Sequence, residues 1–242
     1  MNRYKIADLT VDINFRGELL KRRSEKYKIE YDKSTAADIV IDISPDEINK
    51  RVENSKANLD YDSFEYMMTG TSFYRSLIKF GGFMLHASAV VLDNKAYLFS
   101  APCGTGKSTH TALWEEYFKS KGAYVINDDK PAIRLGENDE FFVYGTPWSG
   151  KSDKNVNSRV PLGAICFLER SEINCIEKLG VFDSIQKLVW QTIRPSEKED
   201  LSALLSLQDK LIQKYGIYKM GCKIDYDAVE LAYKTMNTDK EI

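Results

Sequence analysis

Residues 96–118 read AYLFSAPCGTGKSTHTALWEEYF, and this stretch decides the expected fold. An apolar segment leads into small residues, and Lys107, Ser108 and Thr109 follow at the start of a helical pattern. A strand, a small-residue turn and a helix in this order are typical of a phosphate-binding loop. The backbone N–H groups of such a turn surround phosphate oxygens, and the helix N-terminus adds partial positive charge. The stretch therefore predicts a nucleotide site.

The motif assigns roles to individual residues. We expect Lys107 to reach the β- and γ-phosphates and Ser108 to hold Mg²⁺. The strict pattern G-x-x-x-x-G-K-[ST] begins with glycine, where this chain has Ala101, and alanine is acceptable there unless the backbone needs a positive φ. The alternative is a tight turn that binds nothing. The expected nucleotide-binding residues are Gly104, Thr105, Gly106, Lys107, Ser108 and Thr109.

A pair of acids forms the second candidate feature. The segment AYVINDD at 123–129 reads as a buried strand that ends in Asp128 and Asp129. A carboxylate beside a phosphate loop is a typical metal ligand or water-positioning group, so one acid would accept a hydroxyl proton and the other would bind Mg²⁺. An Asx turn at a strand end is the alternative. His86 lies in an apolar segment that we expect to be a strand, where a histidine is usually a satisfied core residue.

Composition limits the class of protein. The 242 residues are 43% hydrophobic and 29% charged, as in globular proteins of one or two domains. The formal net charge of −2, without long runs of one sign, gives no reason to expect a nucleic-acid or membrane partner. The N-terminus has no signal-peptide pattern, and we expect a cytoplasmic protein. Separate reduced thiols are expected for Cys103, Cys166, Cys175 and Cys222.

Hydrophobic periodicity predicts strands and helices in mixed order. Strands or hairpins are expected at 4–15, 36–44, 83–93, 95–102, 123–129, 131–148 and 160–170. Asp93-Asn94 is the expected two-residue turn of a hairpin. Helices are expected from the Ser44-Pro45 cap and at 64–82, 108–122, 184–193, 199–216 and 226–237. This mixture predicts an α/β fold with α+β features and a mixed sheet flanked by helices. We divide the chain into an N-terminal β-rich region of unknown role, 1–75, and a P-loop nucleotide-binding kinase domain, 76–242.

Three segments resemble HPr kinase/phosphorylase and its relatives, which share their nucleotide-binding core with ATP-dependent phosphoenolpyruvate carboxykinase. They are MLHASAVVLDNKAYLFSAPCGTGKST at 84–109, the CGTGKST within it, and AYVINDDKPAI at 123–133. The resemblance covers residues 80 to 135, and it implies that core fold and the use of ATP and Mg²⁺.

The resemblance also implies roles for matching residues. Lys107 and Ser108 would take the phosphate and Mg²⁺ roles. Asp128 would match the general base that deprotonates the acceptor hydroxyl, and Asp129 would be its metal-side neighbour. His86 would lie beside the acid pair near the transferred phosphate. The residue types alone leave open which acid is the base and which binds the metal.

The chain also departs from this family. HPr kinases have serine where this chain has Cys103 and glycine where it has Ala87. Their later glycine- and arginine-containing signature, which serves HPr recognition and dephosphorylation, has no counterpart, and GTPWSGKSDKNVNSR at 145–159 occupies about its place. We interpret this segment either as a lid or as a solvated loop with a packed tryptophan. As a lid, it would offer cations near the transferred group from Lys151, Lys154 and Arg159.

We expect an ATP- and Mg²⁺-dependent kinase that phosphorylates a hydroxyl, with serine as the first candidate. Three acceptors stay open: an HPr-like carrier protein, a peptide such as the precursor of a ribosomally made natural product, and free serine or another small metabolite. The missing HPr signature disfavours the first. The alternative function is a nucleotide-binding regulatory or accessory protein with little catalysis. HPr kinases form hexamers, so the resemblance also implies a homo-oligomer.

Overall fold

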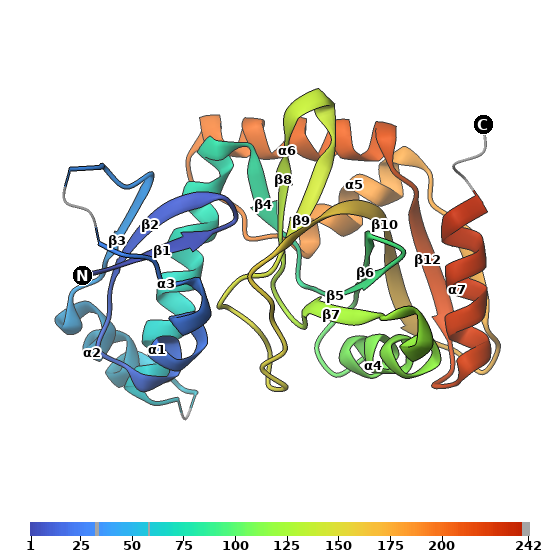
Figure 1. The fold of residues 1–242 in the computed structure, drawn as a ribbon, viewed down its shortest axis with the longest axis horizontal. Helices are drawn as coiled ribbons and strands as arrows, with labels where there is room; N and C mark the ends of the chain where they lie inside the picture. The colour runs from blue at the N-terminus through green and yellow to red at the C-terminus, as the bar shows by residue number, and fades with distance from the viewer. Residues whose placement is uncertain (32–33, 58, 239–242) are drawn as a thin grey trace.

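The computed structural model describes residues 1–31, 34–57 and 59–238, which form two β-sheets with helices packed around them (Figure 1). The smaller sheet has three strands and the larger sheet has nine, in both parallel and antiparallel pairs. This arrangement confirms an α/β fold with a mixed sheet and flanking helices. The more specific expectation, a P-loop kinase core, stays a prediction.

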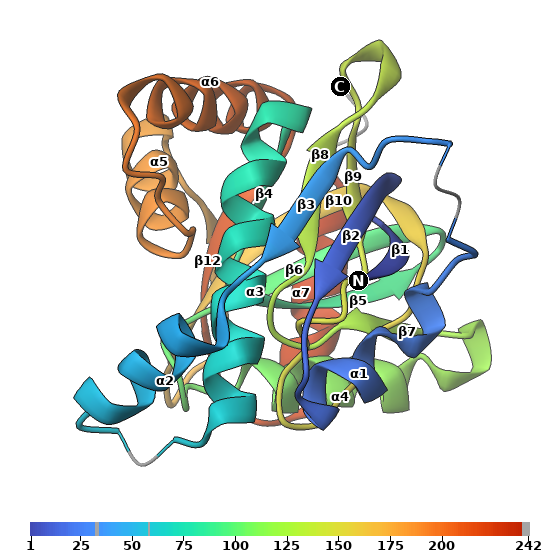
Figure 2. The same ribbon diagram turned by 90° about the vertical axis from the view of Figure 1, so that its left-hand side faces the viewer.

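The smaller sheet lies near the N-terminus (Figure 2) and contains β1 (Asn2–Ile6), β2 (Leu9–Asn14) and β3 (Ile39–Asp42). β1 and β2 are antiparallel, and β3 runs parallel to β2. The single strand expected at 4–15 is wrong, because the chain turns back at Ala7 and Asp8. Their φ angles of 52° and 61° interrupt the extended conformation. The strand expected at 36–44 is confirmed in its central part.

Three helices pack with this sheet: α1 (Glu18–Ser24), α2 (Pro45–Asn54) and α3 (Tyr61–Leu77). The expected cap is confirmed, because the Ser44 side chain accepts a hydrogen bond from the Glu47 N–H at 3.2 Å. α3 runs past residue 75, where we placed the domain boundary, and the chain then turns at Gly81 with a φ of 70°. The N-terminal third thus combines helices and strands, and "β-rich" describes only part of it. The division into two domains stays a prediction.

The larger sheet carries the predicted site at one edge. β10 pairs in parallel with β6 and with β12, and β5 pairs in antiparallel fashion with β6 and β7. The C-terminal ends of β6, β7, β10 and β12 therefore reach the same edge, which is where α/β sheets bind ligands. The strands are β4 (Gly82–Met84), β5 (Ala87–Leu92), β6 (Lys95–Ser100), β7 (Tyr124–Asn127), β8 (Ala132–Leu135), β9 (Phe141–Tyr144), β10 (Arg159–Arg170), β11 (Cys175–Lys178) and β12 (Ile217–Cys222).

The hairpin between β5 and β6 follows the sequence prediction. Asp93 and Asn94 have φ angles of 50° and 56°, as a two-residue type I′ turn requires. The strand expected at 83–93 is instead divided into β4 and β5, which pair with different neighbours. His86 lies in the connection between them and not on a strand, which corrects our expectation for this residue.

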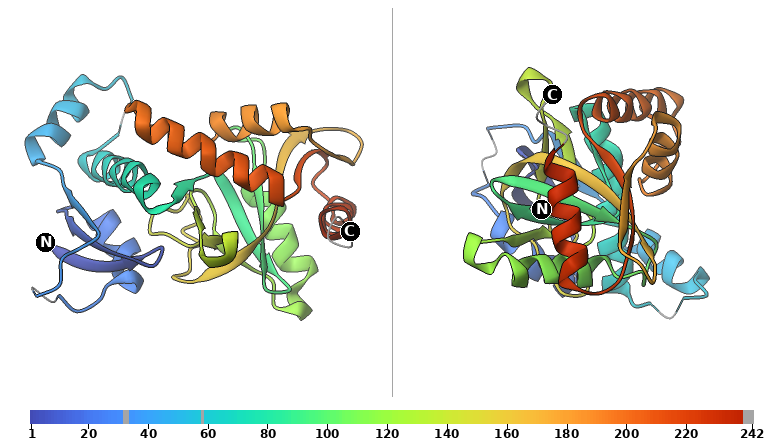
Figure 3. Two further views of the ribbon diagram at one scale, coloured as in Figure 1. Left: turned by 90° about the horizontal axis from the view of Figure 1, so that it is seen from above. Right: turned by 90° about the vertical axis from the view of Figure 1, so that its right-hand side faces the viewer.

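Helices cover both faces of the larger sheet, as the views in Figure 3 show. α4 (Lys107–Tyr117) and α7 (Tyr226–Thr238) pack on one face, and α5 (Val181–Trp190) and α6 (Lys198–Lys214) pack on the other. Successive side chains of β6 point to opposite faces of the sheet. Leu98 packs in the hydrophobic core with α5 and α6, and Phe99 packs in the core with α4. The helix expected at 108–122 is shorter than predicted, because α4 ends at Tyr117.

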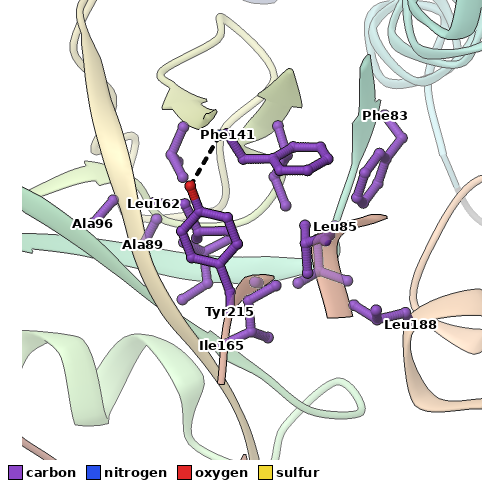
Figure 4. Packing of buried hydrophobic residues seen from close by; sticks show 14 of the residues in the cluster. Phe83, Leu85, Ala89, Ala96, Phe141, Leu162, Ile165, Leu188 and Tyr215 are labelled. Atoms are coloured by element: carbon purple, nitrogen blue, oxygen red, sulfur yellow. Dashed lines mark hydrogen bonds between the residues drawn. The ribbon is translucent and has the colours of Figure 1, made fainter. Parts of the chain in front are cut away.

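Apolar side chains fill much of the core on the α5 and α6 side (Figure 4), where the polar side chains of Ser184 and Gln208 are also buried. Figure 4 also shows the Tyr215 hydroxyl, which accepts a hydrogen bond from the Phe141 N–H at 3.0 Å. The four cysteines are free, as expected. Within the described ranges, no helix combines the length and the apolar character that crossing a membrane requires.

Candidate functional site

The turn at residues 101–106 joins the end of β6 to the start of α4. Gly104 and Gly106 have φ angles of 77° and 120°, a region in which side chains are strained, and no atom lies within 4 Å of a Cβ added at either position. Ala101 is not among the residues with positive φ, so alanine is compatible with the first motif position. The strand, turn and helix that the motif predicts are confirmed, and phosphate binding stays a prediction.

Lys107 is the first residue of α4 and is only 7% exposed. Its ammonium group donates hydrogen bonds to the carbonyl oxygens of Ala101 at 2.8 Å and Pro102 at 3.4 Å. Burial lowers the pKa of Lys107, and the negative charge of Asp129 partly offsets that effect. The carbonyl oxygens of the turn therefore hold the Lys107 ammonium in place.

Of the other residues at the start of α4, two are exposed to solvent and two are buried in the core. Ser108 and Thr109 are exposed, so their hydroxyls are available to a ligand. Thr111 lies 2.7 Å from the Ser88 hydroxyl and links the helix to β5. His110 is buried and accepts a hydrogen bond from Trp114 Nε1 at 3.1 Å, and burial lowers its pKa to about 4. His110 is thus a neutral core residue.

The two adjacent acids have different surroundings. Asp128 is only 3% exposed, and its carboxylate accepts hydrogen bonds from the Gly150 N–H at 2.5 Å and from the Ser152 hydroxyl. Its own N–H donates to the Lys154 carbonyl at 3.1 Å. The structure therefore joins Asp128 to the loop at 149–154 and not to His86 or Lys107.

Asp129 is the acid that contacts His86. Its Oδ1 lies 3.1 Å from His86 Nε2, and its Oδ2 contacts the Lys130 ammonium. Burial alone would raise the pKa of Asp129, but the His86 hydrogen bond and the Lys130 charge outweigh it and lower the pKa to about 2. Asp129 is therefore ionised at neutral pH.

His86 is fixed from its other side by Gln191, at the end of α5. His86 Nδ1 lies 3.1 Å from Gln191 Oε1, and the His86 N–H donates to the Gln191 carbonyl at 2.8 Å. The Ser100 hydroxyl donates to the His86 carbonyl at 2.9 Å. Sequence reasoning missed Gln191, because only the packing of α5 on the sheet brings it to His86.

A cavity of about 780 Å³ opens beside the turn on the α4 side. It is bounded by Gly104 and Thr109, by Arg170 at the end of β10, and by Lys223 after β12. Arg170 donates to the Gly104 carbonyl at 2.6 Å. The volume lies within the usual range of about 300 to 1,000 Å³ for small-molecule sites. The sequence did not identify Arg170 or Lys223 as site residues, because each is marked only by its position at the end of a strand.

Residues 145–149 are all buried, whereas most of 151–159 is exposed, so the segment is a partly solvated loop with a packed tryptophan and not an exposed lid. Trp148 stacks on Phe73 of α3 with ring centroids 4.8 Å apart. Two of the three cations expected here are engaged elsewhere: Lys154 contacts Glu115, and Arg159 lies 2.8 Å from Asp8. The third, Lys151, is exposed. The segment is thus part of the packing between the N-terminal region and the larger sheet.

Comparison with known proteins leaves the family open. No family model matches the chain, and no curated protein matches it either. Among solved structures, the Hpr(Ser) kinase/phosphatase from Coxiella burnetii is similar at 14% identity and a TM-score of 0.37, over 64% of this chain and 95% of that one. At this level of similarity, conclusions about chemistry must come from the residues of the site itself.

Proposed function

We propose that the protein is an ATP- and Mg²⁺-dependent kinase that transfers the γ-phosphate to a hydroxyl, serine first, of a protein, peptide or small metabolite. The observation that carries the proposal is the grouping of three side chains. Lys107 is a buried cation at a helix N-terminus. The turn that holds it follows Ser100, whose hydroxyl donates to the His86 carbonyl at 2.9 Å, and His86 Nε2 lies 3.1 Å from Asp129. A cation for the phosphate beside a carboxylate for the acceptor is the arrangement that phosphoryl transfer requires.

On the phosphate side, Lys107 and the backbone N–H groups of residues 104–108 would stabilise charge on the transferred group. The glycines of the turn leave the space beside it open. The nucleoside part of ATP would occupy the cavity of about 780 Å³, where Arg170 and Lys223 supply positive charge.

On the acceptor side, we transfer the base role from Asp128 to Asp129. As the hydroxyl oxygen bonds to the γ-phosphorus, its proton would pass to Asp129, and the bond from phosphorus to the departing ADP oxygen would break. A carboxylate with a pKa of about 2 is a weak base, which suits a loose transition state in which positioning dominates. His86 would hold Asp129 in place, and Asp128 would fix the neighbouring loop.

The residues present also suit Mg²⁺. In phosphoryl-transfer sites this ion is held by one or two carboxylates, or in P-loop proteins by a Ser or Thr hydroxyl and an Asp, together with phosphate oxygens and water. The described residues contain no group of three or more His, Cys, Asp or Glu side chains arranged to hold a metal. The exposed Ser108 hydroxyl would be the protein ligand, and bound Mg²⁺ would neutralise charge on the phosphates.

The proposal is tested by mass spectrometry of acceptors incubated with ATP and Mg²⁺. The panel contains free serine, a carrier protein and degenerate peptides, and Lys107→Ala serves as the blank. A phosphate mass gain that requires Lys107 would establish the kinase. Bound ATP without any phosphoproduct would contradict it and favour a regulatory nucleotide-binding protein.

A further inference from the structure

A second cavity, of about 410 Å³, lies on the other side of the 101–106 turn, between the turn and α5. Ala101 and Pro102 line it on the turn side, and Trp190 and Gln191 line it on the helix side. It shares Leu168 and Glu169 with the larger cavity but none of the residues of α4. The turn is therefore flanked by two separate openings.

This cavity is linked to the predicted reaction centre through the hydrogen bonds of a residue in its wall. Gln191, in its wall, lies 3.1 Å from His86 Nδ1, and His86 in turn lies 3.1 Å from Asp129. The carbonyl oxygens that receive the Lys107 ammonium belong to Ala101 and Pro102, which also line the cavity. A molecule in the cavity would thus lie next to the residues that hold both the base and the phosphate-side cation.

Large apolar side chains are exposed on α5 next to the cavity, and one of them, Trp190, also lines it. Trp190 is 68% exposed, and the Arg194 guanidinium lies 5.4 Å from the centre of its ring. Phe182 is 78% exposed, and Val181 beside it is also exposed. Phe182, Gln186 and Trp190 follow one another at intervals of four residues, so they share one face of α5. We call Phe182 and Trp190 the α5 surface.

The α5 surface is too long for a small metabolite. Phe182 and Trp190 are separated by eight residues of helix, or about 12 Å at a rise of 1.5 Å per residue. An extended chain covers that distance with about four residues at roughly 3.3 Å each. A free amino acid with its hydroxyl at Asp129 could not also reach Phe182.

The charges in the cavity favour a ligand without strong charge at this position. Glu169 and Lys187, the charged side chains that line the cavity, have opposite signs and lie 3.5 Å apart, so the lining carries no net charge. Lys219, whose ammonium lies 3.1 Å from Glu169, is outside the lining. Large exposed aromatic side chains are the residues that contribute most to binding of a polypeptide partner. The occupant that fits these features is an extended peptide with apolar side chains.

We propose that the phosphate acceptor is a polypeptide segment that binds along the α5 surface and the adjoining cavity, with bulky apolar residues flanking the acceptor hydroxyl. This inference rests on the proposed kinase function. Trp190 and Phe182 then determine specificity, and neither takes part in the transfer itself.

The test uses degenerate peptides with a fixed central serine, phosphorylated by the full-length protein and then sequenced. We expect enrichment of Leu, Ile, Phe or Trp beside the phosphoserine. For an enriched peptide, Trp190→Ala and Phe182→Ala should each raise KM about tenfold or more, with kcat and the affinity for ATP unchanged. Ile173→Ala, which removes a side chain that is also largely exposed but lies outside the cavity, is the matched control.

The outcomes separate the two proposals. Phosphorylation of free serine as efficiently as of any peptide, or peptide kinetics that Trp190→Ala leaves unchanged, would overturn the inference and leave the kinase intact. A change of oligomeric state in Trp190→Ala, with peptide KM unchanged, would assign the α5 surface to a second copy of the chain and also overturn it. Absence of phosphoproduct from every acceptor would reject the kinase function itself.

Discussion

The Asp129 carboxylate lies 3.1 Å from His86 Nε2, although the two residues belong to connections that leave different strands. Asp129 follows β7, and His86 joins β4 to β5. Gln191 holds the opposite side of the imidazole ring, so α5 takes part in positioning the pair. The candidate reaction centre is thus assembled from three distant parts of the chain.

Replacing Lys107 should weaken nucleotide binding. Lys107→Met removes the only buried cation described at the turn, so we expect ATP affinity to fall by at least about tenfold. Calorimetric titration with ATP and Mg²⁺ measures this. Lys119→Met, beyond the C-terminus of the same helix, is the control and should bind normally. Equal affinity in the two variants would remove the phosphate role from Lys107.

Asp128 should contribute to stability through the loop that it holds. Asp128→Asn keeps one acceptor oxygen but loses the other, so it leaves the Gly150 N–H or the Ser152 hydroxyl without its partner. We expect the free energy of unfolding in urea to fall by about 1–3 kcal/mol. Ser152→Ala should reproduce part of this loss. Unchanged stability with complete loss of transfer would return the base role to Asp128.

Gln191 should act as a positioning residue for His86. Gln191→Leu has similar bulk but lacks the amide oxygen 3.1 Å from His86 Nδ1. We expect kcat to fall about tenfold or more with the KM for ATP unchanged, because a misplaced group slows the chemical step without affecting nucleotide binding. Gln191→Glu, which retains an acceptor oxygen, should recover part of the rate. Normal kcat in Gln191→Leu would show that His86 needs no such support.

His110 should make the folded state sensitive to mild acid. Burial lowers its pKa from 6.5 to about 4, so below pH 6.5 the unfolded chain binds a proton that the folded chain does not. Stability should therefore fall between pH 6.5 and about 4, by up to about 1.4 kcal/mol per pH unit. Asp129 affects stability only at lower pH, because the ordinary pKa of its carboxyl is 3.8 and folding lowers that pKa to about 2.

The variant His110→Gln tests whether His110 causes the loss of stability in mild acid. Its amide oxygen can still accept the hydrogen bond from Trp114 Nε1, but the side chain does not titrate. Urea unfolding at pH 7 and pH 5 should show a smaller loss of stability for the variant than for the unaltered protein. The same loss in both proteins would locate the acid sensitivity elsewhere.

Local chemistry made part of this fold predictable. Ser44 caps α2, Asp93 and Asn94 form the hairpin turn, and Lys107 begins α4, as expected from neighbouring residues alone. Each of these features depends on backbone conformation or hydrogen bonding within a few residues, which a short pattern specifies.

Long-range packing determined what the sequence did not reveal. The different environments of Asp128 and Asp129 depend on the loop at 149–154 and on His86, which approach from distant segments. β12 was missed because its parallel pairing with β10 and the packing of α7 define it more than its own short pattern does. Likewise, Trp148 is buried because α3 supplies its aromatic partners.

The central claim is that Asp129 serves the acceptor while Lys107 serves the phosphate. The most direct measurement is the single-turnover rate of phosphoryl transfer from ATP in Asp129→Asn and Asp128→Asn, together with the ATP affinity of both variants. We expect Asp129→Asn to bind ATP normally and to lose at least about 10²-fold in rate, with a smaller loss in Asp128→Asn. An Asp129→Asn variant that transfers phosphate at the normal rate would contradict the assignment.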